Sequence, residues 1–208
     1  TAPHSIDFFT AMNRGKIILI DTAKDFLKDG SAVFGKLIVS QLLQAVLERA
    51  ALPESQRHPT YILIDEAASF FGSNIDDFLT EARKFKVGMV LAHQTLEKAS
   101  SDLKASLASN TSTKFIGGAS SADARAMAAD MRTTPEFILS QPRLHFAAYV
   151  RNATSHAVSV PITPGALSRL PPKQHFEAFL ERNRALVSYA QEAPKTTPDA
   201  TDEMSDAY

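Results

Sequence analysis

The chain has 208 residues, of which 44% are hydrophobic and 22% charged, and its formal net charge at pH 7 is −1. These values are ordinary for a folded domain and give no overall basic field, so contact with DNA would need a local patch or an oligomer. The sequence has no cysteine, which excludes disulfides and Cys-ligated metals, and no continuous apolar run of the roughly 18 residues that a membrane-spanning helix needs.

The first half of the chain alternates short apolar runs with longer helical patterns. Lys16–Asp21 (KIILID), Tyr61–Asp65 (YILID) and Val87–His93 (VGMVLAH) are continuous apolar runs of strand length. Between them, helices are predicted over Ser31–Ala50, whose first residue is the expected N-cap, and over Ile75–Phe85. Apolar residues at helical spacing predict the buried faces of these two helices: Phe34, Leu37, Ile38, Leu42, Ala45, Val46, Phe78, Leu79 and Ala82.

The next segment predicts a short helix, a fourth strand and a capped helix. Asp102–Ser109 has the pattern of the short helix, and Thr113–Gly118 that of the strand. Ser120, with Asp123 three residues later, resembles a capping box that opens a helix reaching Met131. A further short helix is expected just beyond it, with a proline at its first position.

The last third changes character and sets the domain layout. LHFAAYVR and HAVSVPI alternate apolar and polar residues and are joined by Asn152–Ser155, which predicts an antiparallel hairpin. Continuous apolar strands separated by helices predict an α/β fold, a mostly parallel sheet covered on both faces, with the hairpin at its edge. Residues 1–170 are expected to form this domain, 171–190 a C-terminal helix and 191–208 an acidic disordered tail.

Two carboxylates follow the second predicted strand. YILIDEAASFF places Asp65 and Glu66 at the carboxyl tip of a buried strand, where ligands bind in open α/β sheets. One carboxylate there can hold Mg²⁺ through a water, and its neighbour can deprotonate an attacking water. The pattern is equally typical of an aspartate that caps the next helix beside a solvated glutamate.

Two further polar residues surround the third predicted strand. Gln94 follows its tip, where an amide can donate to a phosphate and accept from a water. Its neighbour His93 is more typical of a packed or surface histidine. Arg83, in EARKFKVG, lies before the strand and is either a solvated helix charge or a guanidinium that neutralises phosphate charge.

The order of these motifs resembles the C-terminal ATPase region of TraG/TraD-type conjugative coupling proteins and of related HerA-like ATPases of the HerA/FtsK superfamily. The matching segments are GKIILID, YILIDEAASFF, EARKFKVGMVLAHQTL, SNTSTKFIGG and PRLHFAAYVR, over roughly Gly15 to Pro161. The resemblance implies a RecA-like P-loop NTPase core. It implies that Asp65 is the Walker B residue that binds Mg²⁺, that Glu66 is the catalytic base, that Gln94 is a catalytic sensor which also contacts the nucleotide, and that Arg83 is an arginine finger acting in trans.

One departure from the family is decisive for activity. No segment fits G-x-x-x-x-G-K-[ST], and Gly15-Lys16 is followed by an apolar run instead of Ser or Thr. The backbone cradle and lysine that grip phosphates are therefore missing, and the chain is expected to be a C-terminal portion that is inactive by itself. Two alternatives remain open: a degenerate, catalytically silent paralogue, and a non-catalytic RecA-like module that docks a partner.

The resemblance also implies cofactors, partners and a location. ATP and Mg²⁺ are expected in the intact protein, and DNA is expected as the translocated partner of a homohexamer. Relaxosome or secretion-system proteins are expected to dock on the acidic tail, residues 191–208. The location implied is cytoplasmic, at the inner-membrane face where a separate N-terminal region provides an anchor.

Overall fold

The fold is seen in a computed structural model that describes residues 6–22, 24–71, 75–97, 99–163, 165 and 176–187. The chain divides into two units, residues 7–170 and residues 1–6 with 171–208. The helix described in the smaller unit is α8 (Phe176–Val187). The predicted acidic tail, 191–208, lies outside the described residues.

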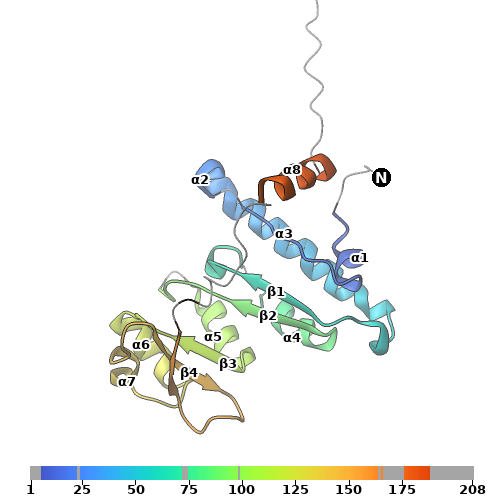
Figure 1. Ribbon diagram of the computed structural model, residues 1–208. Coiled ribbons are helices and arrows are strands. Elements are labelled where there is room, and N and C mark those ends of the chain that lie inside the picture. The colour runs from blue at the N-terminus through green and yellow to red at the C-terminus, as the bar shows by residue number, and fades with distance from the viewer. Residues whose placement is uncertain are drawn as a thin grey trace, which may run out of the picture. The chain divides into compact units, whose positions relative to one another are not determined.

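A two-stranded parallel sheet forms the first part of the larger unit (Figure 1). β1 (Thr60–Ile64) pairs with β2 (Val87–Leu91) in register, from Thr60 opposite Val87 to Ile64 opposite Leu91. The helices of this part are α1 (Phe8–Asn13), α2 (Lys24–Leu27), α3 (Asp29–Glu48), α4 (Ile75–Lys84) and α5 (Ser101–Asn110), with 3-10 turns at Arg49–Ala51, Glu54–Gln56 and Ala67–Ser69.

A three-stranded antiparallel sheet forms the second part. Its order is β3 (Thr113–Ile116), β4 (His145–Val150) and β5 (Val158–Pro161). The predicted hairpin is confirmed as β4–β5, but it pairs with β3 in this separate sheet and does not lie at the edge of the parallel one. Two short helices, α6 (Ser121–Ala128) and α7 (Pro135–Leu139), complete this part, and both begin at side-chain caps that the sequence suggests. The core here is made of small and medium apolar side chains: Ala124, Ala128, Met131, Ile138, Ala147, Tyr149 and Ala157.

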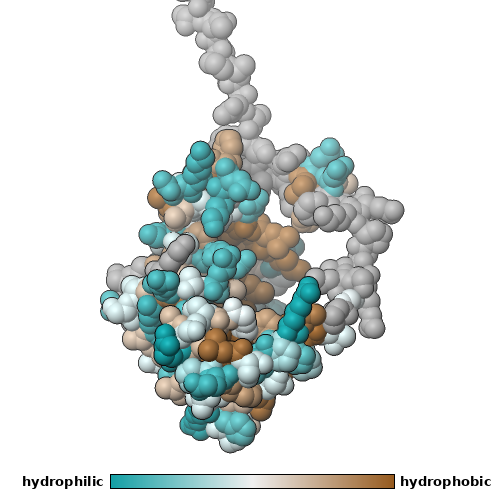
Figure 2. Space-filling model, turned by 90° about the vertical axis from the view of Figure 1, so that its left-hand side faces the viewer, coloured by the Kyte–Doolittle hydropathy of each residue, from teal (hydrophilic) through white to brown (hydrophobic). Residues whose placement is uncertain are grey.

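The predicted α/β class is confirmed, but only one face of the β1–β2 sheet is covered by the described residues. Alternate side chains such as Ile62 and Met89 pack with α3 and α4 in the main core. The opposite face carries Tyr61 and Leu63, each 72% exposed, and Val90, 53% exposed. Continuous apolar strands predict burial on both faces, and here the second face has no described layer upon it. Brown, apolar areas show among the hydrophilic side chains in Figure 2.

The predicted strand at Lys16–Asp21 is wrong for this structure. Residues 16–21 have no regular secondary structure, and Ile17 and Leu19 are 91% and 77% exposed while Ile18 packs on the main core. An apolar run becomes a strand only when a neighbouring strand accepts and donates its backbone hydrogen bonds. Within the described residues this run pairs with neither sheet.

The long predicted helix is present, but Ser31 is not its N-cap. α3 begins at Asp29 after Lys28, whose φ of 47° breaks the path from α2, and Ser31 is buried inside the first turn. Ala45 and Val46 are buried as predicted, whereas Leu37 is 54% exposed. Together with its 3-10 extension the helix, Asp29–Ala51, is long and apolar enough to cross a membrane by length and composition. Ala45, Val46 and Leu42 of this helix pack on the core of the unit, whereas Val33 is 69% exposed.

A glycine in α3 sets the position of the turn that follows β1. The ring of Phe70 lies where a Cβ on Gly35 would be. Phe70 ends the 3-10 turn Ala67–Ser69, so the missing side chain lets this turn approach α3 closely. The turn begins directly after Glu66, which connects this packing to the strand tips.

Candidate functional site

The tips of β1 and β2 come together at one edge of the parallel sheet. Asp65 and Glu66 follow β1, and His93 and Gln94 follow β2. Backbone hydrogen bonds continue the pairing beyond the strands, from the Ala92 N–H to the Ile64 carbonyl and from the Ala67 N–H to the Ala92 carbonyl, both at 2.9 Å. Parallel pairing therefore fixes the acidic pair beside the glutamine, as the sequence predicts.

Glu66 makes the closest side-chain contact of this edge. Gln94 Nε2 donates to Glu66 Oε1 at 2.6 Å. Glu66 has a φ of 52°, a left-handed conformation that is uncommon for a residue with a side chain, and its N–H donates to Asp65 Oδ1 at 2.9 Å. Holding a residue in this backbone conformation costs free energy, and residues held in this way are often found at functional sites. It brings the carboxylate within reach of the Gln94 amide.

A pocket of about 170 Å³ opens at this contact. Its size matches a phosphate group better than a whole nucleotide, since sites for drug-sized ligands are usually about 300–1,000 Å³. The lining combines one acid, an amide, hydroxyls, an imidazole and an ammonium: Lys24, Glu66, Ala68, Ser69, His93, Gln94 and Thr95. The ammonium group of Lys24 and the hydroxyl and amide donors suit an anionic ligand such as a phosphate. The carboxylate of Glu66 suits a base that takes a proton from a water bound beside that ligand.

Of the seven lining residues, reasoning from the sequence identifies Glu66 and Gln94 and misses the other five, including the two with a basic group, His93 and Lys24. The sequence favours a packed or surface role for His93, although its place next to Gln94 at a strand tip is a usable indication of a site. Lys24 lies on the four-residue helix α2, far from the other lining residues in sequence, and no local pattern marks it. The fold alone brings this ammonium group to the pocket.

Asp65 is exposed at the same edge and does not line the pocket. Among the described residues no three His, Asp or Glu side chains gather into a site that could hold a metal by protein ligands alone. Magnesium, however, is usually held by one or two carboxylates, several waters and the phosphates of the substrate. An exposed carboxylate beside a phosphate-sized pocket fits that kind of coordination, and the position of Asp65 is compatible with it.

Arg83 lies at the other end of the sheet. It lines a second pocket of about 280 Å³ at the amino ends of the strands, together with Pro59, Thr60, Tyr61, Lys86, Val87 and Gly88. A five-residue strand spans roughly 16 Å at about 3.3 Å per residue, which separates the two ends of the sheet. The structure therefore brings Glu66 and Gln94 together and does not bring Arg83 to them within one chain.

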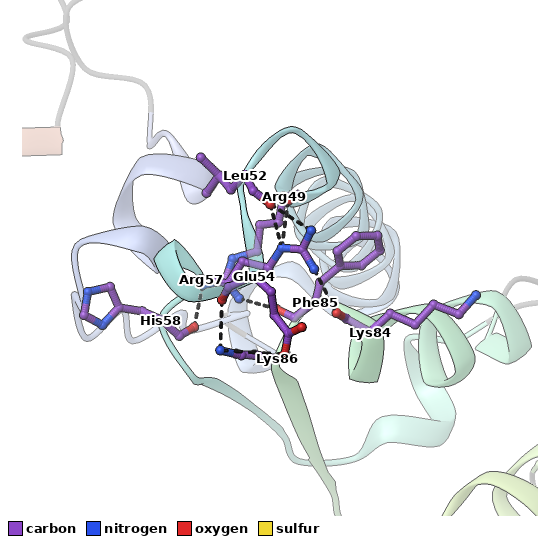
Figure 3. Close-up of polar contacts among 8 residues, drawn as sticks. All are labelled: Arg49, Leu52, Glu54, Arg57, His58, Lys84, Phe85 and Lys86. Atoms are coloured by element: carbon purple, nitrogen blue, oxygen red, sulfur yellow. Dashed lines mark hydrogen bonds and ion pairs between the residues drawn. The ribbon is translucent and has the colours of Figure 1, made fainter.

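Two arginines hold the end of α4 that carries Arg83 (Figure 3). Arg49 is fully buried, and its guanidinium donates to Asn13 Oδ1 at 3.0 Å, to the Phe85 carbonyl at 2.8 Å and to the His58 carbonyl at 2.5 Å. Burial, followed by the charge of Arg57, lowers the pKa of Arg49. Its acceptors are uncharged, and carbonyls at helix ends carry the partial negative charge that suits a cation.

Arg57 completes this anchor from the exposed side. Its Nη1 donates to the Lys84 carbonyl at 3.1 Å, and its guanidinium lies 5.1 Å from the centre of the Phe85 ring. It also donates to the carbonyls of Arg49 and Leu52. The last turn of α4 is thus tied to the end of α3, which fixes where Arg83 emerges.

The loop after Gln94 is held by a buried carboxylate from α6. Asp123, only 7% exposed, accepts from the Leu96 N–H at 3.0 Å, from the Thr95 hydroxyl at 3.2 Å and from the Ser120 hydroxyl at 2.9 Å. Burial by itself raises the pKa of Asp123. The hydrogen bonds from Ser120, Leu96 and Thr95, with the nearby His93, outweigh burial and leave the pKa below its ordinary value of 3.8.

This lowered pKa predicts how acid affects the fold. A carboxyl whose folded pKa lies below its unfolded value stabilises the protein above the unfolded value, and this contribution is lost as pH falls through the folded pKa. Wild-type chain should therefore exceed Asp123→Asn in free energy of unfolding at pH 6, and the difference should shrink as pH falls below 3.8. Urea unfolding of both chains across this range measures it; a difference that does not change with pH would contradict the expectation.

Comparison with known proteins bears on the fold. No family model matches the sequence, and no curated protein matches it. The structure is similar to the genome packaging NTPase B204 from Sulfolobus turreted icosahedral virus 2 in complex with ATP-gammaS, with a TM-score of 0.53 and 17% identity over 77% of this chain and 74% of that chain. The AMPPCP complex of B204 gives a TM-score of 0.54 and 17% identity over 76% and 73%. The chain therefore shares the α/β fold of this NTPase, which agrees with the predicted fold class.

Proposed function

We propose that this chain supplies the acidic and amide half of an ATPase site in a DNA-translocating motor. The observation that carries the proposal is the 2.6 Å contact between Gln94 and Glu66 at the carboxyl edge of a parallel sheet, beside a phosphate-sized pocket. It is supported by the shared fold with B204, a genome packaging NTPase solved with two ATP analogues. Within this class we favour a motor of the TraG/TraD or HerA-like kind, because the motifs of this chain follow the same order as in the ATPase region of those proteins.

The chemistry assigned to each residue follows from its position. Glu66 accepts the proton of the attacking water, and the Gln94 amide holds that carboxylate in one orientation while its oxygen remains free to accept from the water. Lys24 faces the charge of the terminal phosphate. Mg²⁺ beside Asp65 would neutralise charge on the phosphate oxygens.

The phosphate cradle must come from residues outside this chain, because the sequence has no G-x-x-x-x-G-K-[ST] segment. Two features support an added strand and helix. Within the described residues β2 pairs only with β1, and β3 only with β4, so each sheet offers an open edge. The apolar face of Tyr61, Leu63 and Val90 is also exposed and suits a covering helix.

Arg83 acts in this proposal on the site of a neighbouring copy. Its place at the end of the sheet away from Glu66 rules out contact with its own site, and a guanidinium supplied in trans is an established way to stabilise phosphoryl transfer. A ring of copies, a homohexamer by resemblance, would bring it there with DNA in the channel. The acidic tail would dock relaxosome or secretion-system proteins, and the motor would work in the cytoplasm or at the inner-membrane face.

A phosphate titration of this chain tests the site. Inorganic pyrophosphate with Mg²⁺ should shift the side-chain amide resonance of Gln94 with a dissociation constant of about 1 mM or weaker, because half of the site is absent. Gln94→Ala should abolish saturable shifts around Glu66, whereas Arg83→Ala should leave them unchanged.

Two outcomes would count against the proposal. An absence of any change near Glu66 and Gln94 at tens of millimolar pyrophosphate would remove the phosphate site and favour a non-catalytic module that docks a partner. Micromolar affinity of the isolated chain for ATP, measured by calorimetry, would instead show that no further half is needed.

A further inference from the structure

The loop that carries Gln94 is not held by its own sheet alone. Its next two residues, Thr95 and Leu96, bond to Asp123, which lies on α6 beside the three-stranded sheet. Gln94 itself reaches back to Glu66 on the parallel sheet. Two sets of hydrogen bonds, joined by the backbone between Gln94 and Thr95, therefore connect α6 to the carboxylate of the site.

Asp123 uses its carboxylate for this loop rather than for its own helix. In a capping box the acid at this position would accept from the backbone N–H of the cap residue. Here the Ser120 hydroxyl caps α6 by accepting from the Asp123 N–H at 3.1 Å, while the Asp123 oxygens accept from Thr95, Leu96 and the Ser120 hydroxyl. The cap and the loop contact are thus separable parts of the same cluster.

We propose that Asp123 is a positioning residue that holds the Gln94 amide against Glu66 and so couples the three-stranded sheet to the nucleotide site. This inference rests on the proposed function for its catalytic consequence, but its structural part stands independently. A carboxylate is suited to the task because it accepts several hydrogen bonds at once and needs no donor of its own.

Burial makes the arrangement rigid. Asp123 is 7% exposed, so a donor that lost this acceptor would not readily find water in its place. The Thr95 hydroxyl is fixed twice, because it donates to Asp123 and accepts from the Glu97 N–H at 3.1 Å. Movement of α6 would therefore move the backbone next to Gln94. The position of the three-stranded sheet and the position of the Gln94 amide in the site are coupled in this way.

The test compares variants that weaken the loop contact with one that removes the Ser120 hydroxyl, which loses the cap of α6 and one hydrogen bond to the Asp123 carboxylate but no bond to the loop. Asp123→Asn and Thr95→Val each weaken the loop contact with little change of shape, and Ser120→Ala removes the cap while leaving the bonds to Thr95 and Leu96. In the first two, hydrogen exchange of the Leu96 amide and of the Gln94 side-chain amide should rise about tenfold, as expected for one lost hydrogen bond. Ser120→Ala should lower the melting temperature without this rise.

Turnover in the assembled ATPase gives the second readout. Asp123→Asn and Thr95→Val should lower kcat by about tenfold and leave KM within about twofold, since an oriented base acts mainly in the transition state. Equal exchange of the Gln94 amide in wild type and both loop variants, or the same rise in Ser120→Ala, would overturn the positioning role. If exchange changes as expected and no ATPase exists, the proposed function fails while the structural coupling remains.

Discussion

Glu66→Gln should lower ATP turnover of the assembled motor by about 10² or more and leave nucleotide affinity nearly unchanged, because it removes the general base alone. Glutamine keeps the shape of the side chain. Its amide oxygen can still accept from Gln94 Nε2, so the 2.6 Å contact at the strand tips can persist. Steady-state ATPase assays with binding of a fluorescent ATP analogue measure both quantities.

The matched control is Ser69→Ala, which changes another residue of the same pocket and removes no group assigned to catalysis. It should retain turnover within about threefold, as is usual for a surface substitution. Turnover of Glu66→Gln at the level of this control would show that Glu66 is not the base.

Assemblies that mix two variants distinguish an active site formed within one chain from an active site shared between neighbouring chains. Glu66→Gln and Arg83→Ala chains should each be inactive alone, and mixing them should restore part of the turnover, since some neighbouring pairs then combine an intact Glu66 with an intact Arg83. Mixtures that stay as inactive as either parent would contradict the trans role that the position of Arg83 at the far end of the sheet supports.

Arg49→Met should lower the free energy of unfolding by at least about 3 kcal/mol, the largest effect expected outside the site. Methionine fills much of the volume but leaves Asn13 and the carbonyls of His58 and Phe85 without their donor, at about 1 kcal/mol for each of these part-buried hydrogen bonds. For a chain of this size such a loss lowers the melting temperature by roughly 6–12 °C. Thermal and urea unfolding of the chain measure the change.

Lys84→Met is the control for charge and length at a neighbouring position. Lys84 is exposed, and its ion pair within the described part of the chain is with Glu81 at 2.7 Å; exposed ion pairs contribute about 0–1 kcal/mol. Its melting temperature should stay within about 4 °C of wild type. A similarly small change in Arg49→Met would show that the buried arginine is not what fixes the end of α4.

The sequence by itself determined the features that depend on neighbours along the chain. The apolar run YILID followed by Asp65 and Glu66, the cap at Ser120 and the β4–β5 hairpin are encoded in consecutive residues, and all appear in the structure. The site edge was also predictable, because parallel strands with polar residues after their carboxyl ends must present them at the same edge. Asp65, Glu66 and Gln94 lie at this edge, and their catalytic roles stay predictions.

Only the tertiary structure decided features that depend on partners far away in sequence. KIILID has the pattern of a buried strand, yet within the described residues it pairs with neither sheet. A strand needs a neighbouring strand to complete its backbone hydrogen bonds, and the local sequence does not show whether one is present. Lys24 reaches the pocket and Asp123 turns from its cap to the Gln94 loop through contacts that no local pattern encodes. Arg83, by contrast, lies away from Glu66 because it directly precedes β2 in the chain and therefore stands at the amino edge of the sheet, a position that the order of the motifs already indicates.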